Sequence, residues 1–367
     1  MRPWRSCSSW TSRRRQPASR RRLRHSRCVE GRAHARPFLF GPRGRWRLRS
    51  RFAATGAIIT PWSGTLAEDL SACLVVGISS RALFDLRRED ALFVSAGLDA
   101  YRAEQLSRED EILPPGTGFS LAQAVLGLNT PGAPRRAEVV VMSRNSTETS
   151  LRIFNSIRHY GLDITRAALS GGAPLAPYLK AFHVDLFLSG YEDDVRRALD
   201  GGVAAALLYD RPEDPFEPAE EIRIAFDGDA ILFSDEAERV FQADGLEAFV
   251  RHEAERAREP LPAGPFANLL HKLSALQRAA GREGATPIRT ALVTARGGPA
   301  HERVIRTLLA WGIVVDEAFF LGGVPKTEIL EAFRPHIFFD DQAAHCERAA
   351  PRIPTGRVPT SGREHEA

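Results

Sequence analysis

"VTARGGPAHERVIRTLLAWGIVVDEAFFLGGVP" occupies residues 293–325, and "MSRNSTETSLRIFNSIRHYGLDITRAALSGGAP" at 142–174 aligns with it without a gap. Both stretches begin at the end of an apolar strand and continue with apolar residues at helical spacing. Gly161 and Gly312 stand where a glycine would end each helix. A short apolar run and a Gly-Gly turn follow in both. Strands that alternate with helices in this way are typical of a parallel α/β sheet.

The similarity extends in both directions from these two stretches. "LKAFHVDLFLSG" (179–190) matches "LEAFRPHIFFDD" (330–341), and "VVGISSRALF" (75–84) matches "IAFDGDAILF" (224–233). We infer a tandem duplication of a unit of about 150 residues. Each unit is expected to have a first strand followed by a largely helical insert, and then further strands. The expected strands are 73–78, 138–142 and 184–188 in the first unit, and 222–227, 289–293 and 335–339 in the second.

Charged and hydroxyl residues distinguish the strand ends of the second unit. They are Asp227, Asp229, Thr294, Lys326 and Asp340-Asp341, whereas the aligned residues of the first unit are Ile78, Ser80, Ser143, Leu175 and Ser189-Gly190. An Asp-Gly-Asp sequence is also an ordinary turn. The requirements of the framework cannot explain these charges, however, because the first unit does without them. They indicate a ligand site at the carboxyl ends of the strands.

Four short motifs carry a family resemblance. "DGDAIL", "LVTARG", "GGVPK" and "FFDD" resemble, in the right order, the motifs of the haloacid dehalogenase (HAD) superfamily of phosphohydrolases. "ISSRALFDL", "NSIRHYGL" and "PIRTALVTAR" resemble the cytosolic type I 5′-nucleotidases, and the resemblance covers about residues 70–359. It implies a HAD-like (Rossmannoid) α/β fold. The catalytic unit would be 216–360 with a helical insert, or cap, at 234–288, and 70–215 would be a degenerate copy.

The residue types at these positions suit phosphoryl transfer. Mg²⁺ prefers oxygen ligands and usually takes one or two carboxylates, which Asp227 and Asp340 supply. The resemblance adds the backbone carbonyl of Asp229 as a third metal ligand. Asp227 would attack phosphorus and form an aspartyl-phosphate. Asp229 would protonate the departing nucleoside oxygen and then accept a proton from the hydrolytic water. The substrate implied is a nucleoside 5′-monophosphate such as AMP.

The remaining site residues have more than one interpretation. Thr294 offers its hydroxyl and backbone N–H to a phosphoryl oxygen, or it caps the helix expected at 297–310. Lys326 follows Pro325, a favoured first helical residue, so ammonium and helix N-terminus would act together on the phosphoryl group. Arg296 contacts phosphate or base. Asp341 binds metal or orients Lys326.

Other side chains near the motifs have weaker claims. His345 and Cys346 are expected to pack within a helix, because Mg²⁺ sites rarely use imidazole. Phe249, Phe266 and the helix "FANLLHKLSALQRA" could enclose a nucleoside, or could belong to the core.

Two rival functions stay open. The motifs specify phosphoryl chemistry and not the alcohol, so the chain could be a phosphatase or phosphotransferase for another small phosphomonoester. It could also be a nucleotide-sensing protein without turnover, although binding alone would not need Asp229. The resemblance further allows a nucleotide effector and a homo-oligomer, for which no residue was identified.

Composition separates the N-terminal segment from the rest of the chain. Residues 1–51 hold 17 Arg and one acidic residue, a net charge of +16, whereas the other 316 residues hold 33 basic and 45 acidic residues, a net charge of −12. Segment 1–60 lacks apolar periodicity and is expected to be disordered. It could be a nucleic-acid arm, a transit peptide, or an extension read from upstream of the native start. We assign it no function and expect no nucleic-acid partner.

The cysteines and the hydropathy indicate the compartment. The four cysteines form no CxxC pair, which disfavours a zinc ribbon or a disulfide scaffold. No apolar run approaches the ~20 residues of a membrane span. We therefore expect a cytoplasmic protein without membrane contact.

Overall fold

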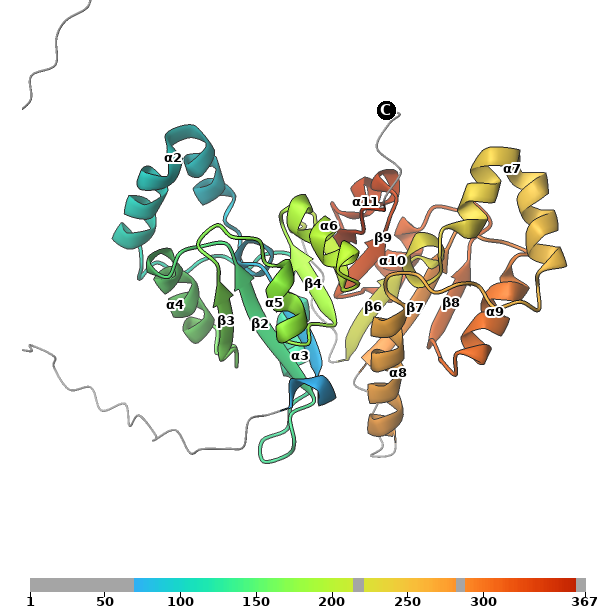
Figure 1. Cartoon of the computed structure of the whole chain (residues 1–367), viewed down its shortest axis with the longest axis horizontal. Helices are drawn as coiled ribbons and strands as arrows, with labels where there is room; N and C mark the ends of the chain where they lie inside the picture. Colours follow the sequence, from blue (N-terminus) through green and yellow to red (C-terminus); the bar gives the residue numbers. More distant parts are fainter. Residues whose placement is uncertain (1–68, 214–220, 282–287, 361–367) are drawn as a thin grey trace, which may run out of the picture. The chain divides into compact units, whose positions relative to one another are not determined.

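The computed structural model describes residues 69–213, 221–281 and 288–360. The Arg-rich segment 1–60, predicted to be disordered, lies outside them. The described residues belong to one compact unit. They form a ten-stranded sheet in the order β3-β2-β1-β4-β5-β10-β9-β6-β7-β8, flanked by helices (Figure 1). The prediction of an α/β protein with a largely parallel sheet is confirmed.

The first half of the sheet is all parallel. Its strands are β1 (Leu74–Ile78), β2 (Ala137–Ser143), β3 (Arg166–Leu169), β4 (Leu186–Ser189) and β5 (Ala204–Leu208). Its helices are α1 (Ser80–Leu83), α2 (Arg87–Ser107), α3 (Phe119–Leu126), α4 (Leu151–His159), α5 (Ala176–Ala181) and α6 (Glu192–Asp200).

The second half is also parallel within itself. Its strands are β6 (Ile222–Phe226), β7 (Ile288–Thr294), β8 (Glu317–Phe320), β9 (Ile337–Asp340) and β10 (Thr355–Arg357). A π-helical turn (Gly228–Leu232) follows β6, and the helices are α7 (Glu236–Glu255), α8 (Ala267–Gly281), α9 (His301–Ala310), α10 (Thr327–Phe333) and α11 (Ala343–Ala349). The insert expected at 234–288 contains α7 and α8.

The two halves share one strand order. From the outer edge inward it is β3-β2-β1-β4-β5 in the first half and β8-β7-β6-β9-β10 in the second. The innermost strands, β5 and β10, pair antiparallel. Both strands were missed in the sequence, as was α6, whereas α11 is the helix expected around His345 and Cys346. "AAALL" is a short apolar run without alternation or β-branched residues, which periodicity alone cannot assign to a strand, and three residues are too few to show a period.

Glycines shape corresponding places in the two halves. Gly161 follows α4 with φ of 63° and Gly312 follows α9 with φ of 65°, so the predicted helix ends are confirmed. α2 and α7 each contain one non-helical glycine, Gly97 with φ of 81° and Gly245 with φ of 78°. Glycine takes this left-handed conformation without the steric cost of a Cβ. Both long insert helices therefore bend at that residue.

The turn after the first strand differs between the halves by one residue. Ser79 N–H donates to Leu188 O, and Asp227 N–H donates to Phe339 O, so Ser79 and Asp227 are equivalent. The ungapped alignment of Ile78 with Asp227 was wrong by one position. Phe84 N–H closes its turn on Ser80 O, whereas Phe233 N–H closes on Gly228 O. The second half thus holds one extra residue here, in a turn where Asp229 has extended backbone (φ −71°, ψ 140°) and Ala230 a left-handed one (φ 61°).

Candidate active site

Three buried carboxylates meet at the carboxyl ends of two neighbouring strands. Asp227 directly follows β6, Asp340 ends β9, and Asp341 comes next in the chain. One carboxylate oxygen from each lies within 4.8 Å of the others. β6 and β9 are paired in parallel, which brings their ends together. The sequence placed all three residues in one site, and the structure brings them together.

Lys326 bridges two of these carboxylates. Its Nζ donates to Oδ1 of Asp227 at 2.7 Å and to Oδ2 of Asp340 at 2.6 Å, and all three side chains are buried. The expectation that Pro325 opens the helix is wrong, because α10 begins at Thr327 and Lys326 occupies the N-cap position. Lys326 is nevertheless beside the start of the helix, where its ammonium faces the cluster.

Burial, Lys326 and the neighbouring carboxylates shift the pKa values of the cluster. Burial, together with the nearby Asp340 and Asp229 carboxylates, raises the pKa of Asp227 to about 6, although Lys326 opposes this. Burial alone would raise the pKa of Asp340, but Lys326 and His345 hold it below its usual range. The flanking carboxylates raise the pKa of Lys326 in spite of its burial. Asp227 and Asp340 thus share a single ammonium.

This donor set fits a hard divalent cation. Mg²⁺ binds through carboxylate oxygens, usually from one or two residues. The three converging carboxylates offer such oxygens, and a dication would add positive charge where Asp227 and Asp340 share one ammonium. Ligands of this class suit Mg²⁺ better than softer transition metals. Asp227, Asp340 and Asp341 are therefore the residues that would hold the ion.

Asp229 lies outside this cluster and contacts Arg296 instead. Nε of Arg296 donates to Oδ2 of Asp229 at 2.8 Å, and Nη2 donates to Oδ1 at 2.6 Å. Asp229 sits in the π-helical turn, next to Ala230 with φ of 61°. A two-point ion pair of this kind fixes direction as well as distance. Arg296, predicted to contact phosphate or base, is thus placed against the predicted acid.

Arg296 also reaches the helical insert. Its Nη1 donates to Oε2 of Glu253 on α7, and Oε1 of the same carboxylate accepts from Nη1 of Arg303 at 2.8 Å. The sequence reading missed Glu253 and Arg303. A glutamate in a helix rich in charged residues gives no local sign that it is buried. The sequence around Glu253 therefore offers no signal that would single it out.

Thr294 ends β7 beside the π-helical turn. Its Oγ1 accepts the backbone N–H of Arg296 at 3.2 Å. The alternative role of helix cap is wrong, because α9 starts at His301 with Ala300 at its N-cap. A Cβ added to Gly228 would lie 3.3 Å from Thr294 Oγ1. The hydroxyl is therefore close to the backbone that links Asp227 to Asp229.

His345 makes a contact that was not predicted from the sequence. Its Nδ1 lies 3.2 Å from Oδ2 of Asp340. Cys346 is buried, as expected for a packed helix residue, and its thiol donates to Asp340 O at 3.5 Å. The expectation of helix packing holds for Cys346, whereas His345 lies against a carboxylate of the cluster.

The two candidate aromatic residues lie in different surroundings in the structure. Phe266 is fully buried against Phe226 and Phe339, so it belongs to the core. Phe249 on α7 lies with its ring 5.5 Å from the Arg296 guanidinium. Of the two, only Phe249 is next to a predicted site residue. The leucines of α8 also pack into the core.

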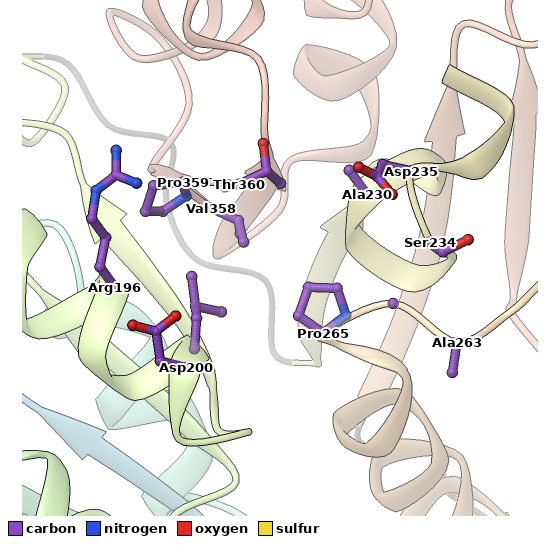
Figure 2. A pocket seen from close by; sticks show the side chains of 12 residues that line it. Arg196, Asp200, Ala230, Ser234, Asp235, Ala263, Pro265, Val358, Pro359 and Thr360 are labelled. Atoms are coloured by element: carbon purple, nitrogen blue, oxygen red, sulfur yellow. The ribbon is translucent and has the colours of Figure 1, made fainter. Parts of the chain in front are cut away.

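A cavity of about 510 Å³ lies beside the π-helical turn. Figure 2 shows Arg196 and Asp200 of α6 on one side of it, and Ala230, Ser234 and Pro265 on the other. None of the three clustered carboxylates is among its lining residues. Its size would admit a small molecule, whereas the buried lysine and carboxylates lie at the strand ends.

A family model described as 5′-nucleotidase matches residues 66–365. The chain belongs to the 5′-nucleotidase family. It is 37% identical over 286 residues to human "Cytosolic 5′-nucleotidase 1B", a match that covers 75% of this chain and 47% of that protein. The chain therefore spans about half the length of this relative. The predicted resemblance to cytosolic type I 5′-nucleotidases is confirmed.

A solved structure of histidinol dehydrogenase from Elizabethkingia anophelis shares 10% identity with this member of the 5′-nucleotidase family. The match covers 65% of this chain and 49% of the other, with a TM-score of 0.21, and we draw nothing from so low a score. Among the residues that the structure describes, no helix is long and apolar enough to cross a membrane.

Proposed function

We propose that this chain is a Mg²⁺-dependent 5′-nucleotidase that hydrolyses nucleoside 5′-monophosphates through an aspartyl-phosphate. One observation carries the proposal: in a member of this family, Asp227, Lys326 and Asp340 meet in a buried cluster at the strand ends. Neither the strand framework nor the core requires a lysine and two carboxylates there. The cytoplasm is the compartment we propose.

In this proposal Asp227 is the nucleophile. Its carboxylate attacks phosphorus and displaces the nucleoside 5′-oxygen, and water then hydrolyses the acyl phosphate. Lys326 neutralises charge on the cluster and on the transferring group. Thr294 donates its hydroxyl to a phosphoryl oxygen. A bound Mg²⁺ would supply electrostatic stabilisation to the phosphoryl group.

Asp229 serves as acid and base. It is two residues beyond the nucleophile, at the π-helical turn. A nucleoside alkoxide is a poor leaving group, so a proton delivered to the 5′-oxygen lowers the barrier. Such proton transfer contributes about 10²- to 10⁴-fold in rate. In the second step Asp229 removes a proton from the attacking water.

Replacing the acid tests this assignment. Asp229→Asn should lower kcat/KM on AMP by about 10²- to 10⁴-fold. On nitrophenyl phosphate, whose leaving group departs without a proton, the loss of kcat/KM should be much smaller. We compare kcat/KM because it reports phosphoryl transfer to Asp227 and not the later hydrolysis step, which both substrates share. An equal loss of kcat/KM on both substrates would exclude the acid role. A panel of nucleotides and sugar phosphates, with phosphate release as readout, distinguishes a nucleotidase from a phosphatase for other monoesters and from a sensor without turnover.

We also propose that the chain is a HAD-like phosphohydrolase in which 216–360 is the catalytic unit and 70–215 a degenerate copy. The shared strand order of the two halves supports this. In the first half Ser79 stands at the position of Asp227, and Oγ of Ser80 lies 3.1 Å from Oγ of Ser143. Hydroxyls satisfy one another there without a cation. The first half would act as a scaffold for the second.

A further inference from the structure

A chain of alternating charges joins the π-helical turn to the helical insert. It runs from Asp229 through Arg296 and Glu253 to Arg303. Arg296 is 4% exposed, Glu253 1% and Arg303 2%. A buried charge is costly unless it is paired and hydrogen-bonded, so each of these side chains requires its neighbours. The four groups form one connected unit across three separate segments.

The hydrogen bonds leave Arg296 little freedom. One edge of its guanidinium donates twice to Asp229, and Nη1 donates to Glu253. Glu253 is in turn held on its other oxygen by Arg303, and Nε of Arg303 donates to Glu259 O at 3.0 Å. The direction of the Asp229 carboxylate therefore depends on a residue of α7 that lies outside every recognised motif.

The described residues of the first half are connected differently, because there Arg81 of α1 pairs with Asp90 of α2 at 2.7 Å. By the offsets of 148 and 151 residues, Gln105 stands in place of Glu253 and Asn145 in place of Arg296. Arg152, aligned with Arg303, forms a buried ion pair with Glu89 at 2.6 Å instead. A buried arginine–glutamate pair thus occurs in both halves. Within the part of the chain that the structure describes, such a buried pair is hydrogen-bonded onward to the turn only in the half that carries the carboxylate cluster.

We propose that Glu253 and Arg303 are positioning residues, which hold Arg296 so that Arg296 orients the catalytic acid Asp229. The helical insert then controls leaving-group protonation. This inference rests on the proposed function, because it assumes that Asp229 is the acid. Misplacement of a catalytic group by about 1 Å can cost on the order of 10²-fold in rate.

The test compares two substrates in the full-length protein. Glu253→Gln keeps the size of the side chain and removes the charge that anchors Arg296. We expect kcat/KM on AMP to fall by about tenfold to a hundredfold. On nitrophenyl phosphate kcat/KM should fall less than about threefold, because its leaving group needs no acid and kcat/KM does not include the shared hydrolysis step. A purely structural role would lower both rates alike.

Glu89→Gln is the matched control. It removes the same charge from a buried ion pair with an arginine, but in the first half and without a link to Asp229. It should change the two rates equally or not at all. If it produces the same substrate-dependent split as Glu253→Gln, the positioning role is wrong.

A second variant covers the case in which Glu253→Gln does not fold. Arg296→Lys keeps the positive charge but loses the two-point contact, and it should show the same split. The inference would be overturned if the variant that folds lost equal activity on both substrates, or lost none on AMP. Asp229→Asn is measured in parallel. If it shows the split and Glu253→Gln does not, only the positioning role fails; if it shows none, the proposed acid role fails as well.

Discussion

Nζ of Lys326 lies 2.7 Å from Oδ1 of Asp227, although 99 residues separate the two in sequence. The contact is buried, and the same ammonium reaches Asp340 at 2.6 Å. β6 and β9 are neighbours in the sheet, and Lys326 stands just before the helix that leads into β9. The sheet topology therefore assembles the cation and the two carboxylates at one point.

Replacing Asp227 should abolish phosphate release and preserve the fold. Asp227→Asn removes the proposed nucleophile, while the Lys326 ammonium keeps Asp340 as its partner. We expect kcat on AMP to fall by more than about 10⁴-fold, with a circular dichroism spectrum like that of the parent.

Ser79→Ala is the control for that variant, because Ser79 stands at the position equivalent to Asp227 in the first half. Its hydroxyl accepts from Ala82 N–H at 3.2 Å, so some stability will be lost. Activity at a temperature well below Tm should be retained. Phosphate release by Asp227→Asn within tenfold of the parent would contradict the assignment.

Mg²⁺ should stabilise the folded chain through the carboxylate cluster. At about a hundred times its Kd, a ligand that binds only the folded state contributes about 2.7 kcal/mol. We expect Tm to rise on addition of Mg²⁺ and to fall back on addition of EDTA. Asp340→Asn should reduce this rise, because it removes a carboxylate that faces the ion.

Ser189→Ala provides the comparison for the metal experiment. Oγ of Ser189 accepts Tyr191 N–H at 3.1 Å, just as Oδ1 of Asp340 accepts Gln342 N–H at 2.9 Å. The variant should keep the full Mg²⁺ response. An unchanged response in Asp340→Asn would show that Mg²⁺ acts elsewhere.

Deleting Ala230 should separate folding from activity. The hydrogen bond from Phe233 N–H to Gly228 O spans five residues, whereas the corresponding bond from Phe84 N–H to Ser80 O spans four. The deletion would give the second half the shorter turn of the first. The positive φ of Ala230 costs about 1–2 kcal/mol, so the shorter turn should leave Tm within a few degrees of the parent. Displacement of Asp229 should lower kcat on AMP by about 10²-fold or more.

Ala230→Gly keeps the length of the turn and relieves the strain, so it should retain both activity and stability. A deletion variant with full activity would show that the extra residue does not place Asp229. Both variants are measured by thermal melting and by phosphate release.

Much of the fold and of the site could be predicted from short stretches of neighbouring residues. Apolar runs of strand length, helices with one apolar face and glycines at helix ends are properties of neighbouring residues, so the order of strands and helices around 142–174 and 293–325 was predictable. The meeting of the carboxylates at the ends of β6 and β9 was also predictable. Parallel strands present their carboxyl ends at one edge of the sheet.

The tertiary structure decided the features that depend on distant partners. The antiparallel pairing of β5 with β10 joins two halves whose contact leaves no local pattern. The one-residue shift at Asp227 became visible only through backbone hydrogen bonds, because the insertion lies within a turn and an ungapped alignment passes over it. The pairing of Asp229 with Arg296 spans 67 residues and continues to Glu253. Sequence determines which side chains can carry charge, but burial and packing select their partners, because only a folded chain excludes the water that would otherwise solvate them.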